Sequence, residues 1–191
     1  AELRQHLPVL REACLIIHRE SPAQFVLAAA PGSNVASLRE GWPPEIPVRV
    51  VLGQTYNALA AADAAIVSSG TATIEAALLD VPMVVVYRVT PLTALLAKPL
   101  VRTPFFSMVN LIAGKRAVPE LIQDDFMPAR VGAEVLRLLN NQSARASLRH
   151  DLAEVRQRLG PPGAVERAAD AILRLLGTEH PQVSIPRGNA K

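Results

Sequence analysis

A run of small polar residues followed by one carboxylate is the part of the sequence best suited to chemistry. Ser68-Ser69-Gly70-Thr71 follows the apolar run Ala64–Val67, and the segment 71–79 after it contains only Ala, Ile, Leu and Thr besides Glu75. A strand that ends in such a turn and continues as a helix leaves backbone amides open, and the helix dipole there favours a bound anion. The pattern indicates a phosphate-binding loop; the alternative is an ordinary helix cap, because Ser and Thr are preferred there in any case.

Glu75 favours the first interpretation. In a capping box the acidic residue lies three positions after the capping Ser or Thr, but the residue three positions before Glu75 is Ala72, which cannot cap. A carboxylate one turn into a phosphate-facing helix is well placed to accept hydrogen bonds from ribose hydroxyls. The alternative for Glu75 is a side chain that faces solvent.

The apolar runs of the sequence predict the strands and helices that position this turn. Runs at Gln24–Ala30, Val48–Leu52, Ala64–Val67 and Met83–Val89 predict strands. Helices are predicted at 2–20, 56–62, 71–79, 91–101, 128–140, 144–159 and 164–176. Continuous apolar strands separated by helices imply an α/β fold, a Rossmann-like parallel sheet with flanking helices. We expect this domain to span 1–142, a C-terminal helical segment 143–177, and a disordered tail 178–191.

Composition excludes several classes of protein. Half of the 191 residues are hydrophobic and 19% are charged, which excludes a disordered chain. The longest apolar run, Val81–Tyr87, is far shorter than the roughly 20 residues of a membrane-spanning helix, and the first residues contain no secretory signal. Cys14 is the only cysteine, so we expect a buried, inert thiol in a reducing compartment. The four histidines show no metal-ligand spacing, and we expect neither metal nor cofactor.

The charge is unevenly distributed. Residues 81–119 contain no Asp or Glu but include five basic residues: Arg88, Lys98, Arg102, Lys115 and Arg116. Such a stretch suits an anionic ligand or a membrane surface, and the alternative is a solvated basic edge. Apolar residues accompany these cations and either contact a membrane or pack on the sheet: Leu92, Leu95, Leu96, Phe105 and Phe106. Nucleic acid fits less well, because aromatic residues make up only 4% of the chain.

Several of these segments together resemble the C-terminal domain of the lipid-A-disaccharide synthase family. They are SGTATIEAALL at 69–79, PMVV at 82–85, YRV at 87–89, NL at 110–111 with AG at 113–114, and PELIQ at 119–123. The resemblance runs from the first helix to about Gly160. The succession of SGTATxE, NLxAG and PELxQ is far more specific than any one of them.

The resemblance implies a GT-B glycosyltransferase, in which two Rossmann-like domains face a cleft. That family joins UDP-2,3-diacylglucosamine to 2,3-diacylglucosamine 1-phosphate (lipid X), forming lipid A disaccharide and releasing UDP. Its C-terminal domain binds the UDP moiety, and its N-terminal domain supplies the acceptor side and the base. By resemblance, Ser69, Gly70 and Thr71 meet the diphosphate, Glu75 the ribose and Asn110 the nucleotide region.

Arg88 is added to these site residues from its position, because a cation directly after a strand can face the same sheet edge. The chain departs from the family at Val109, where Pro is usual, and at Lys115, where Arg is usual. It begins within the family's G-S-R-x-x-E segment, whose Glu corresponds to Glu2, so we expect the first strand and the N-terminal domain to be missing.

We therefore expect a donor-binding half with no catalytic residue of its own, inactive alone. Its expected partners are UDP-2,3-diacylglucosamine, lipid X and the missing GT-B domain, with a homodimer left open. The expected location is cytoplasmic, peripheral on the inner membrane. The alternatives are another GT-B enzyme that uses UDP-GlcNAc, or a non-catalytic nucleotide-binding module or fragment.

Overall fold

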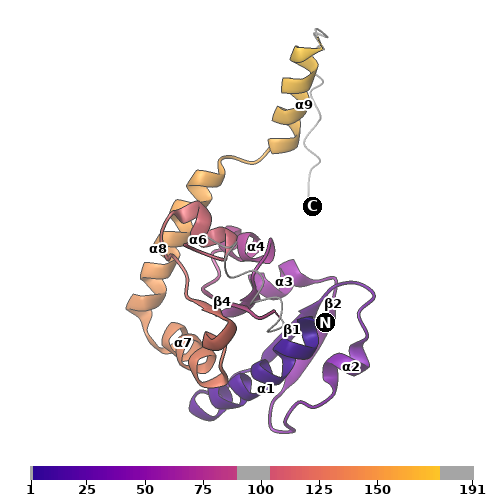
Figure 1. Cartoon of the computed structure of the whole chain (residues 1–191), viewed down its shortest axis with the longest axis vertical. Coiled ribbons are helices and arrows are strands. Elements are labelled where there is room, and N and C mark those ends of the chain that lie inside the picture. The colour runs from indigo at the N-terminus through magenta and orange to yellow at the C-terminus, as the bar shows by residue number, and fades with distance from the viewer. Residues whose placement is uncertain (1, 90–103, 177–191) are drawn as a thin grey trace, which may run out of the picture. The chain divides into compact units, whose positions relative to one another are not determined.

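The computed structural model describes residues 2–89 and 104–176, in which helices and strands largely alternate up to β5 (Figure 1). The elements are α1 (Glu2–Glu20), β1 (Phe25–Ala29), α2 (Val35–Arg39), β2 (Val48–Leu52), α3 (Thr55–Ala60), β3 (Ala65–Ser68), α4 (Ala72–Leu78), β4 (Met83–Tyr87), α6 (Met108–Ala113), β5 (Glu120–Ile122), the 3-10 turn η1 (Gln123–Asp125), α7 (Pro128–Asn140), α8 (Gln142–Leu159) and α9 (Ala164–Leu175). The helix predicted at 91–101 and the tail 178–191 lie outside the described residues.

Every described strand pair is parallel, as the sequence predicts. The strands form two sheets rather than one: β1 pairs with β2, and β4 lies between β3 and β5. Strand β5 was not predicted, because three residues are too few to give a periodic pattern.

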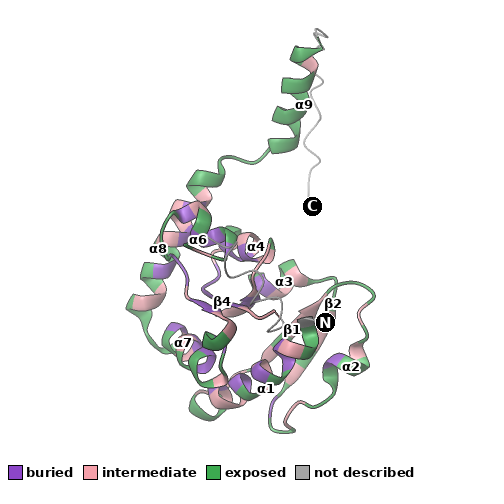
Figure 2. Cartoon of the chain, in the orientation of Figure 1, coloured by how far each residue is buried: buried purple, intermediate pink, exposed green. Residues whose placement is uncertain are grey.

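The core surrounds β4, whose residues Met83–Val86 are at most 1% exposed. Phe126 and Leu152, both fully buried, extend the same core from the segment before α7 and from α8. Figure 2 shows buried residues gathered on β4 and on the inner sides of α7 and α8. Burial of this kind stabilises by about 25 cal/mol per Å² of apolar surface, so we expect a polar residue at positions 83–86 to destabilise the fold.

Helices cover both faces of the strands. On one side α1 packs along α7, and α7 contacts β4. Helix α3 contacts both β1 and β2 and also α4, which follows β3 and lies against it. These contacts build the three-layer arrangement that parallel sheets require.

Cys14 lies within this packing. Its side chain is buried on α1, and burial raises the pKa of the thiol to about 12. The prediction of a buried thiol is confirmed, and the raised pKa supports its being inert.

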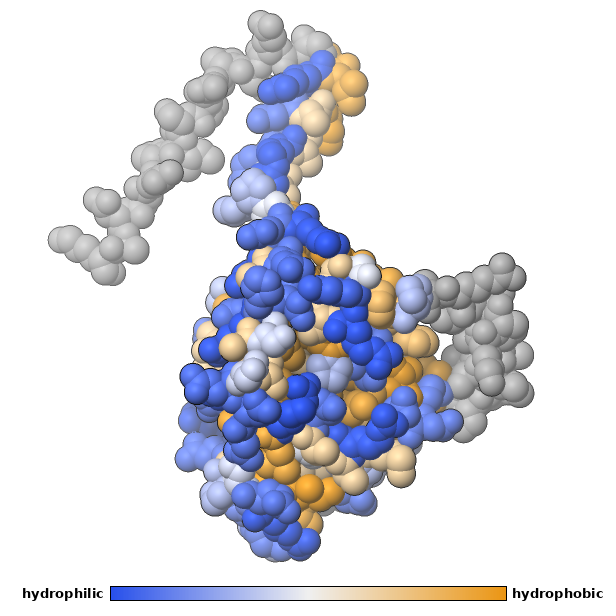
Figure 3. All heavy atoms as spheres, turned by 90° about the vertical axis from the view of Figure 1, so that its left-hand side faces the viewer, coloured by the Kyte–Doolittle hydropathy of each residue, from blue (hydrophilic) through white to orange (hydrophobic). Residues whose placement is uncertain are grey.

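A second compact unit begins at Gly160, and its described part contains α9. Within α9 the apolar side chains of Val165, Ile172 and Leu175 are exposed. Figure 3 shows apolar residues along one side of this helix and polar residues along another. Among the described helices, none has the length and apolar character needed to cross a membrane.

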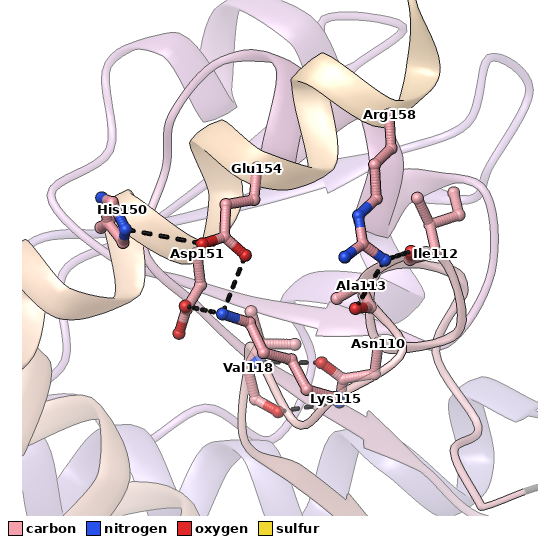
Figure 4. Close-up of polar contacts among 9 residues, drawn as sticks. All are labelled: Asn110, Ile112, Ala113, Lys115, Val118, His150, Asp151, Glu154 and Arg158. Atoms are coloured by element: carbon pink, nitrogen blue, oxygen red, sulfur yellow. Dashed lines mark hydrogen bonds and ion pairs between the residues drawn. The ribbon is translucent and has the colours of Figure 1, made fainter.

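Hydrogen bonds link helix α8 to the C-terminus of α6. The guanidinium of Arg158 donates hydrogen bonds to the carbonyls of Ile112 and Ala113, both at 2.8 Å (Figure 4). These are carbonyls of the last turn of α6, where no helical partner is available. Gly114 closes the helix with a φ of +66°, a left-handed conformation that favours glycine.

Lys115 makes the second link to α8. Its ammonium lies 2.6 Å from the Asp151 carboxylate and 2.9 Å from that of Glu154 (Figure 4). Hydrogen bonds to Asp151 and then Glu154 raise the pKa of Lys115, and the bond from Lys115 lowers the pKa of Glu154. Lys115 is therefore engaged with α8.

We predict that Lys115→Met lowers the melting temperature slightly, and less at high salt, because the ion pair is exposed. The folded chain holds Lys115 protonated and Glu154 ionised more tightly than the unfolded chain does. The contribution is therefore fully present between the ordinary pKa values of 4.5 for Glu and 10.5 for Lys. It disappears as pH falls through the lowered Glu154 pKa or rises through the raised Lys115 pKa.

Thermal melts of wild type and Lys115→Met across pH would check this. Arg116→Met is the matched control, because Arg116 is exposed and has no ion pair within the described chain. An identical loss in both variants would contradict the prediction.

Candidate functional site

The parallel strands β3, β4 and β5 end at one edge, which we call the C-terminal sheet edge. The residues that follow these strands are Ser69, Arg88 and Gln123. In open α/β sheets ligands bind at this edge. A ligand bound at the predicted turn would therefore lie among the loops that begin at Ser69, Arg88 and Gln123.

The loop after β3 is fixed from both sides. The Ser69 amide donates to the Val86 carbonyl at 3.0 Å, and the Ser69 hydroxyl donates to the Phe106 carbonyl at 2.9 Å. The Gly70 carbonyl accepts from the amide of Thr73 at 3.2 Å and from its hydroxyl at 2.7 Å. Thr73 is fully buried, so this bond pins the loop to the core.

Three backbone donors of the same loop have no acceptor among the described residues. The amides of Gly70, Thr71 and Ala72 make no hydrogen bond to another described residue. Gly70 has a φ of +154°, and no heavy atom of a described residue lies within 4 Å of the point where a Cβ would be. Because α4 has only seven residues, the loop amides themselves, more than a long helix dipole, are what the turn offers to an anion.

The two predicted side chains of this turn are also unengaged. The Thr71 hydroxyl forms no capping hydrogen bond, and Thr71 is exposed. Glu75 lies in the first turn of α4, half-buried, and its carboxylate has no hydrogen bond or ion pair within the described chain. The structure thus brings Ser69, Gly70, Thr71 and Glu75 together on one loop and the helix turn after it.

Arg88 lies at the same edge, but its side chain is used internally. The guanidinium donates to the carbonyls of Gln123, at 3.0 and 3.3 Å, and of Phe126, and it lies 5.1 Å from the centre of the Phe126 ring. The Arg88 amide donates to His6 Nε2 at 3.0 Å. Arg88 therefore joins the ends of β4 and β5 to α1.

Asn110 is fully buried on α6, and both ends of its side-chain amide bond to one residue. Its Nδ2 donates to the Val118 carbonyl at 2.9 Å, and its Oδ1 accepts from the Val118 amide at 2.9 Å (Figure 4). This pair closes the turn between α6 and β5. In the structure the Asn110 side chain builds a loop and does not point to the turn at Gly70.

Glu120 and Gln123 hold the edge together and were not predicted as functional. The buried Glu120 carboxylate accepts from the amides of Phe106, at 3.2 Å, and Ser107, at 2.7 Å. Gln123 Oε1 accepts from the Val89 amide at 2.8 Å. Both residues belong to the PELIQ segment noted in the sequence. The sequence alone does not show which distant backbone amides donate hydrogen bonds to the Glu120 carboxylate.

Two hollows lie elsewhere on the described surface. One of about 400 Å³ is lined by residues of β5, α7 and α8, and one of about 470 Å³ by residues of α1 and α2. Neither includes the loop at Gly70. Within residues 2–89 and 104–176 no group of three His, Cys, Asp or Glu side chains is arranged to hold a metal ion.

Solved structures of glycosyltransferases have a similar fold. The calicheamicin glycosyltransferase CalG4 is 26% identical, with a TM-score of 0.54 over 92% of this chain and 40% of that one. The spinosyn rhamnosyltransferase SpnG, 15% identical, has a TM-score of 0.55 over 92% and 42% of the two chains. The fold is that of one domain of a GT-B glycosyltransferase.

A family model described as lipid-A-disaccharide synthetase matches residues 2–174, and the chain belongs to this family. The lipid-A-disaccharide synthase of Syntrophus aciditrophicus is 40% identical over 178 residues, which are 92% of this chain and 46% of that protein. The one of Solibacter usitatus is 42% identical over 184 residues, 96% and 48% of the two proteins. The resemblance seen in the sequence is confirmed, and the chain spans about half the length of these curated relatives.

We predict that Asn110→Ala destabilises the chain by about 2–4 kcal/mol, because it leaves the buried amide and carbonyl of Val118 without partners. Urea denaturation monitored by circular dichroism measures this. Asn57→Ala is the matched control, since Asn57 is exposed on α3 and its side chain has no hydrogen bond in the described chain. Equal stability of the two variants would show that the Val118 pair contributes nothing.

Proposed function

We propose that this chain is the UDP-sugar-binding half of a lipid-A-disaccharide synthase. The whole enzyme condenses UDP-2,3-diacylglucosamine with 2,3-diacylglucosamine 1-phosphate (lipid X) to lipid A disaccharide and UDP. Membership of the family supports the reaction, and coverage of about half of each relative supports the assignment to one half.

The observation that carries the proposal is the loop at Gly70. The amides of Gly70, Thr71 and Ala72 have no hydrogen-bond partner among the described residues, and no described atom lies within 4 Å of a Cβ built at Gly70. The Glu75 carboxylate, which has no hydrogen bond or ion pair within the described chain, lies one helical turn further on. Backbone amides suit the diphosphate of UDP, and a carboxylate suits the ribose hydroxyls, which are donors. A nucleoside diphosphate presents both groups, an anionic diphosphate and the two ribose hydroxyls.

In the proposed reaction the 6-hydroxyl of the acceptor attacks the anomeric carbon of the donor as UDP leaves, with inversion. The amides of Gly70, Thr71 and Ala72 hydrogen-bond the leaving diphosphate and stabilise the negative charge that develops on it. Deprotonation of the acceptor belongs to the other half of the enzyme. We therefore expect this chain alone to bind UDP and not to transfer sugar.

Arg88 and Asn110 contribute indirectly to the proposed nucleotide binding. Arg88 joins the ends of β4 and β5 at the proposed nucleotide edge, and its guanidinium keeps the loop after β5 in place. Asn110 fixes the turn that leads into β5. Both support the loops around the nucleotide rather than contacting it.

Thr71→Pro tests the loop directly, because proline removes one amide donor. Thr71 has a φ of −62°, which proline adopts readily, and its amide has no partner among the described residues, so the fold should be unaffected. We predict a roughly 10- to 100-fold loss of UDP affinity by calorimetry, the value of a hydrogen bond to a charged group. Uridine affinity should not change.

Thr71→Ala is the control, since it removes the hydroxyl and keeps the amide. Equal UDP affinity of the Pro and Ala variants would place the diphosphate elsewhere. Failure of the unmodified chain to bind UDP would contradict the proposed function itself.

We also propose that the enzyme is cytoplasmic and contacts the inner membrane peripherally, because its substrates are acylated. The described residues offer an exposed apolar group beside the site: Phe106 is 46%, Met108 40% and Leu111 46% exposed. Arg116 follows on the same segment, and residues 104–119 contain no acidic residue. Apolar side chains near a cation are the composition of a peripheral membrane contact. Of the other residues suggested for this role, Phe105 is half-buried, and those within 90–103 lie outside the described structure.

The double variant Phe106→Ser, Leu111→Ser should reduce co-sedimentation with vesicles containing phosphatidylglycerol by about tenfold or more, since two half-exposed apolar side chains are lost. Tyr56→Ser, an exposed position on α3, serves as control and should bind like wild type. Binding that ignores the anionic lipid content, or equal binding by both variants, would rule out this contact.

A further inference from the structure

Three exposed apolar side chains lie next to the loop at Gly70: Phe106, Met108 and Leu111. We call them the α6 apolar group. The Ser69 hydroxyl donates to the Phe106 carbonyl at 2.9 Å, so Phe106 directly contacts the residue before Gly70. Helix α6 also contacts α4, and the two helices lie side by side in Figure 1. The α6 apolar group therefore adjoins the loop proposed to bind the diphosphate.

The backbone that carries these side chains is held by several hydrogen bonds. The Phe106 amide donates to both oxygens of the buried Glu120 carboxylate at 3.2 Å, and the Phe106 carbonyl accepts from Ser69. The Ser107 hydroxyl accepts from the Asn110 amide at 3.2 Å and caps α6. All of these bonds use the backbone of residue 106, or other residues, and none uses the Phe106 ring. An ordered segment therefore presents the ring to solvent.

Helix α6 is apolar on its exposed side as well as on its buried side. Val109 and Ala113 are buried in the core, whereas Met108 and Leu111 are exposed. Asn110, the only polar residue of the helix, is itself buried. A helix at the surface of a globular protein normally places polar residues on its exposed side. Apolar residues that gather on an exposed surface are typical of a ligand-binding or interaction site.

The order of groups along the loop indicates which end of a donor lies beside Phe106. Phe106 is hydrogen-bonded to Ser69, which comes before the amides of residues 70–72, and Glu75 comes after them. In a UDP-sugar the ribose and the sugar are attached at opposite ends of the diphosphate. In the proposed function the ribose lies at Glu75, so the sugar lies on the side of Ser69 and Phe106.

We propose that the α6 apolar group is an acyl-chain subsite, in which Phe106 determines the preference for acylated donors. It contacts an acyl chain carried at C2 or C3 of the donor sugar. The carbon that bears the diphosphate is bonded directly to C2, so such a chain begins close to the loop at Gly70. The chain covers the Phe106 ring and the side chains of Met108 and Leu111. The inference rests on the proposed function and adds to it the residues that distinguish an acylated sugar from an unacylated one.

Calorimetry of the whole chain without vesicles tests the subsite. The probes are UDP and UDP-glucosamine analogues that carry acetyl, butyryl or hexanoyl chains at the 2- and 3-positions, short enough to stay in solution. We expect the affinity of wild type to rise roughly two- to fourfold for each CH₂ that reaches the α6 apolar group, the value of a buried methylene. In Phe106→Ser most of this rise should be lost. UDP should bind this variant as it binds wild type, because the substitution keeps both backbone hydrogen bonds of residue 106.

Two further variants make the test specific. Leu111→Ser leaves residue 106 unchanged and should also reduce the rise with chain length. Leu78→Ser is the matched control, since Leu78 is an exposed leucine at the other end of α4 from the loop. It should bind every probe as wild type does.

The outcomes separate this inference from the proposed function. UDP binding with an affinity that does not depend on chain length would leave the proposed function standing and assign the α6 apolar group to membrane lipid alone, against the inference. Equal weakening of UDP and every analogue in Phe106→Ser, with Leu111→Ser like wild type, would give residue 106 a structural role only and also overturn it. No binding of UDP by wild type would overturn the proposed function, and the inference with it.

Discussion

The buried carboxylate of Glu120 is the contact on which the C-terminal sheet edge depends. A buried charge must be compensated, and here the compensation comes from the backbone amides of Phe106 and Ser107. These bonds fix the segment that begins α6, and the Phe106 carbonyl in turn accepts from the Ser69 hydroxyl. The order of the loop after β3 therefore derives from a strand two positions away in the sheet. The amides at Gly70 stay open because the rest of their loop is held by other groups.

The sequence predicted the elements whose patterns are long. Apolar runs located β1 to β4, and the helices predicted at 2–20, 128–140, 144–159 and 164–176 lie within a few residues of the observed α1, α7, α8 and α9. Strand β5 and helix α6 were not predicted, because three and six residues do not carry a period. The division into two sheets could not be predicted from hydrophobic periodicity either. Periodicity indicates whether a segment is buried, but it does not show which strand that segment pairs with.

The candidate site likewise contains residues that the sequence could group and residues whose roles it could not show. Ser69, Gly70, Thr71 and Glu75 are contiguous in sequence, and local chemistry was enough to group them. The roles of Arg88 and Asn110 depend on which distant backbone atoms their side chains reach, the carbonyl of Gln123 in one case and both groups of Val118 in the other. The NLxAG motif accordingly specifies a turn: Asn110 closes it, and Gly114 supplies the left-handed residue. A family motif can describe a loop as readily as a ligand contact.

The single thiol gives this chain a reporter of its own opening. Cys14 is 5% exposed, and with a pKa near 12 it holds almost no thiolate at neutral pH. We therefore expect an alkylating reagent to react with it when α1 separates from the core. The rate of that modification measures how often the helix detaches, in a protein that needs no added label.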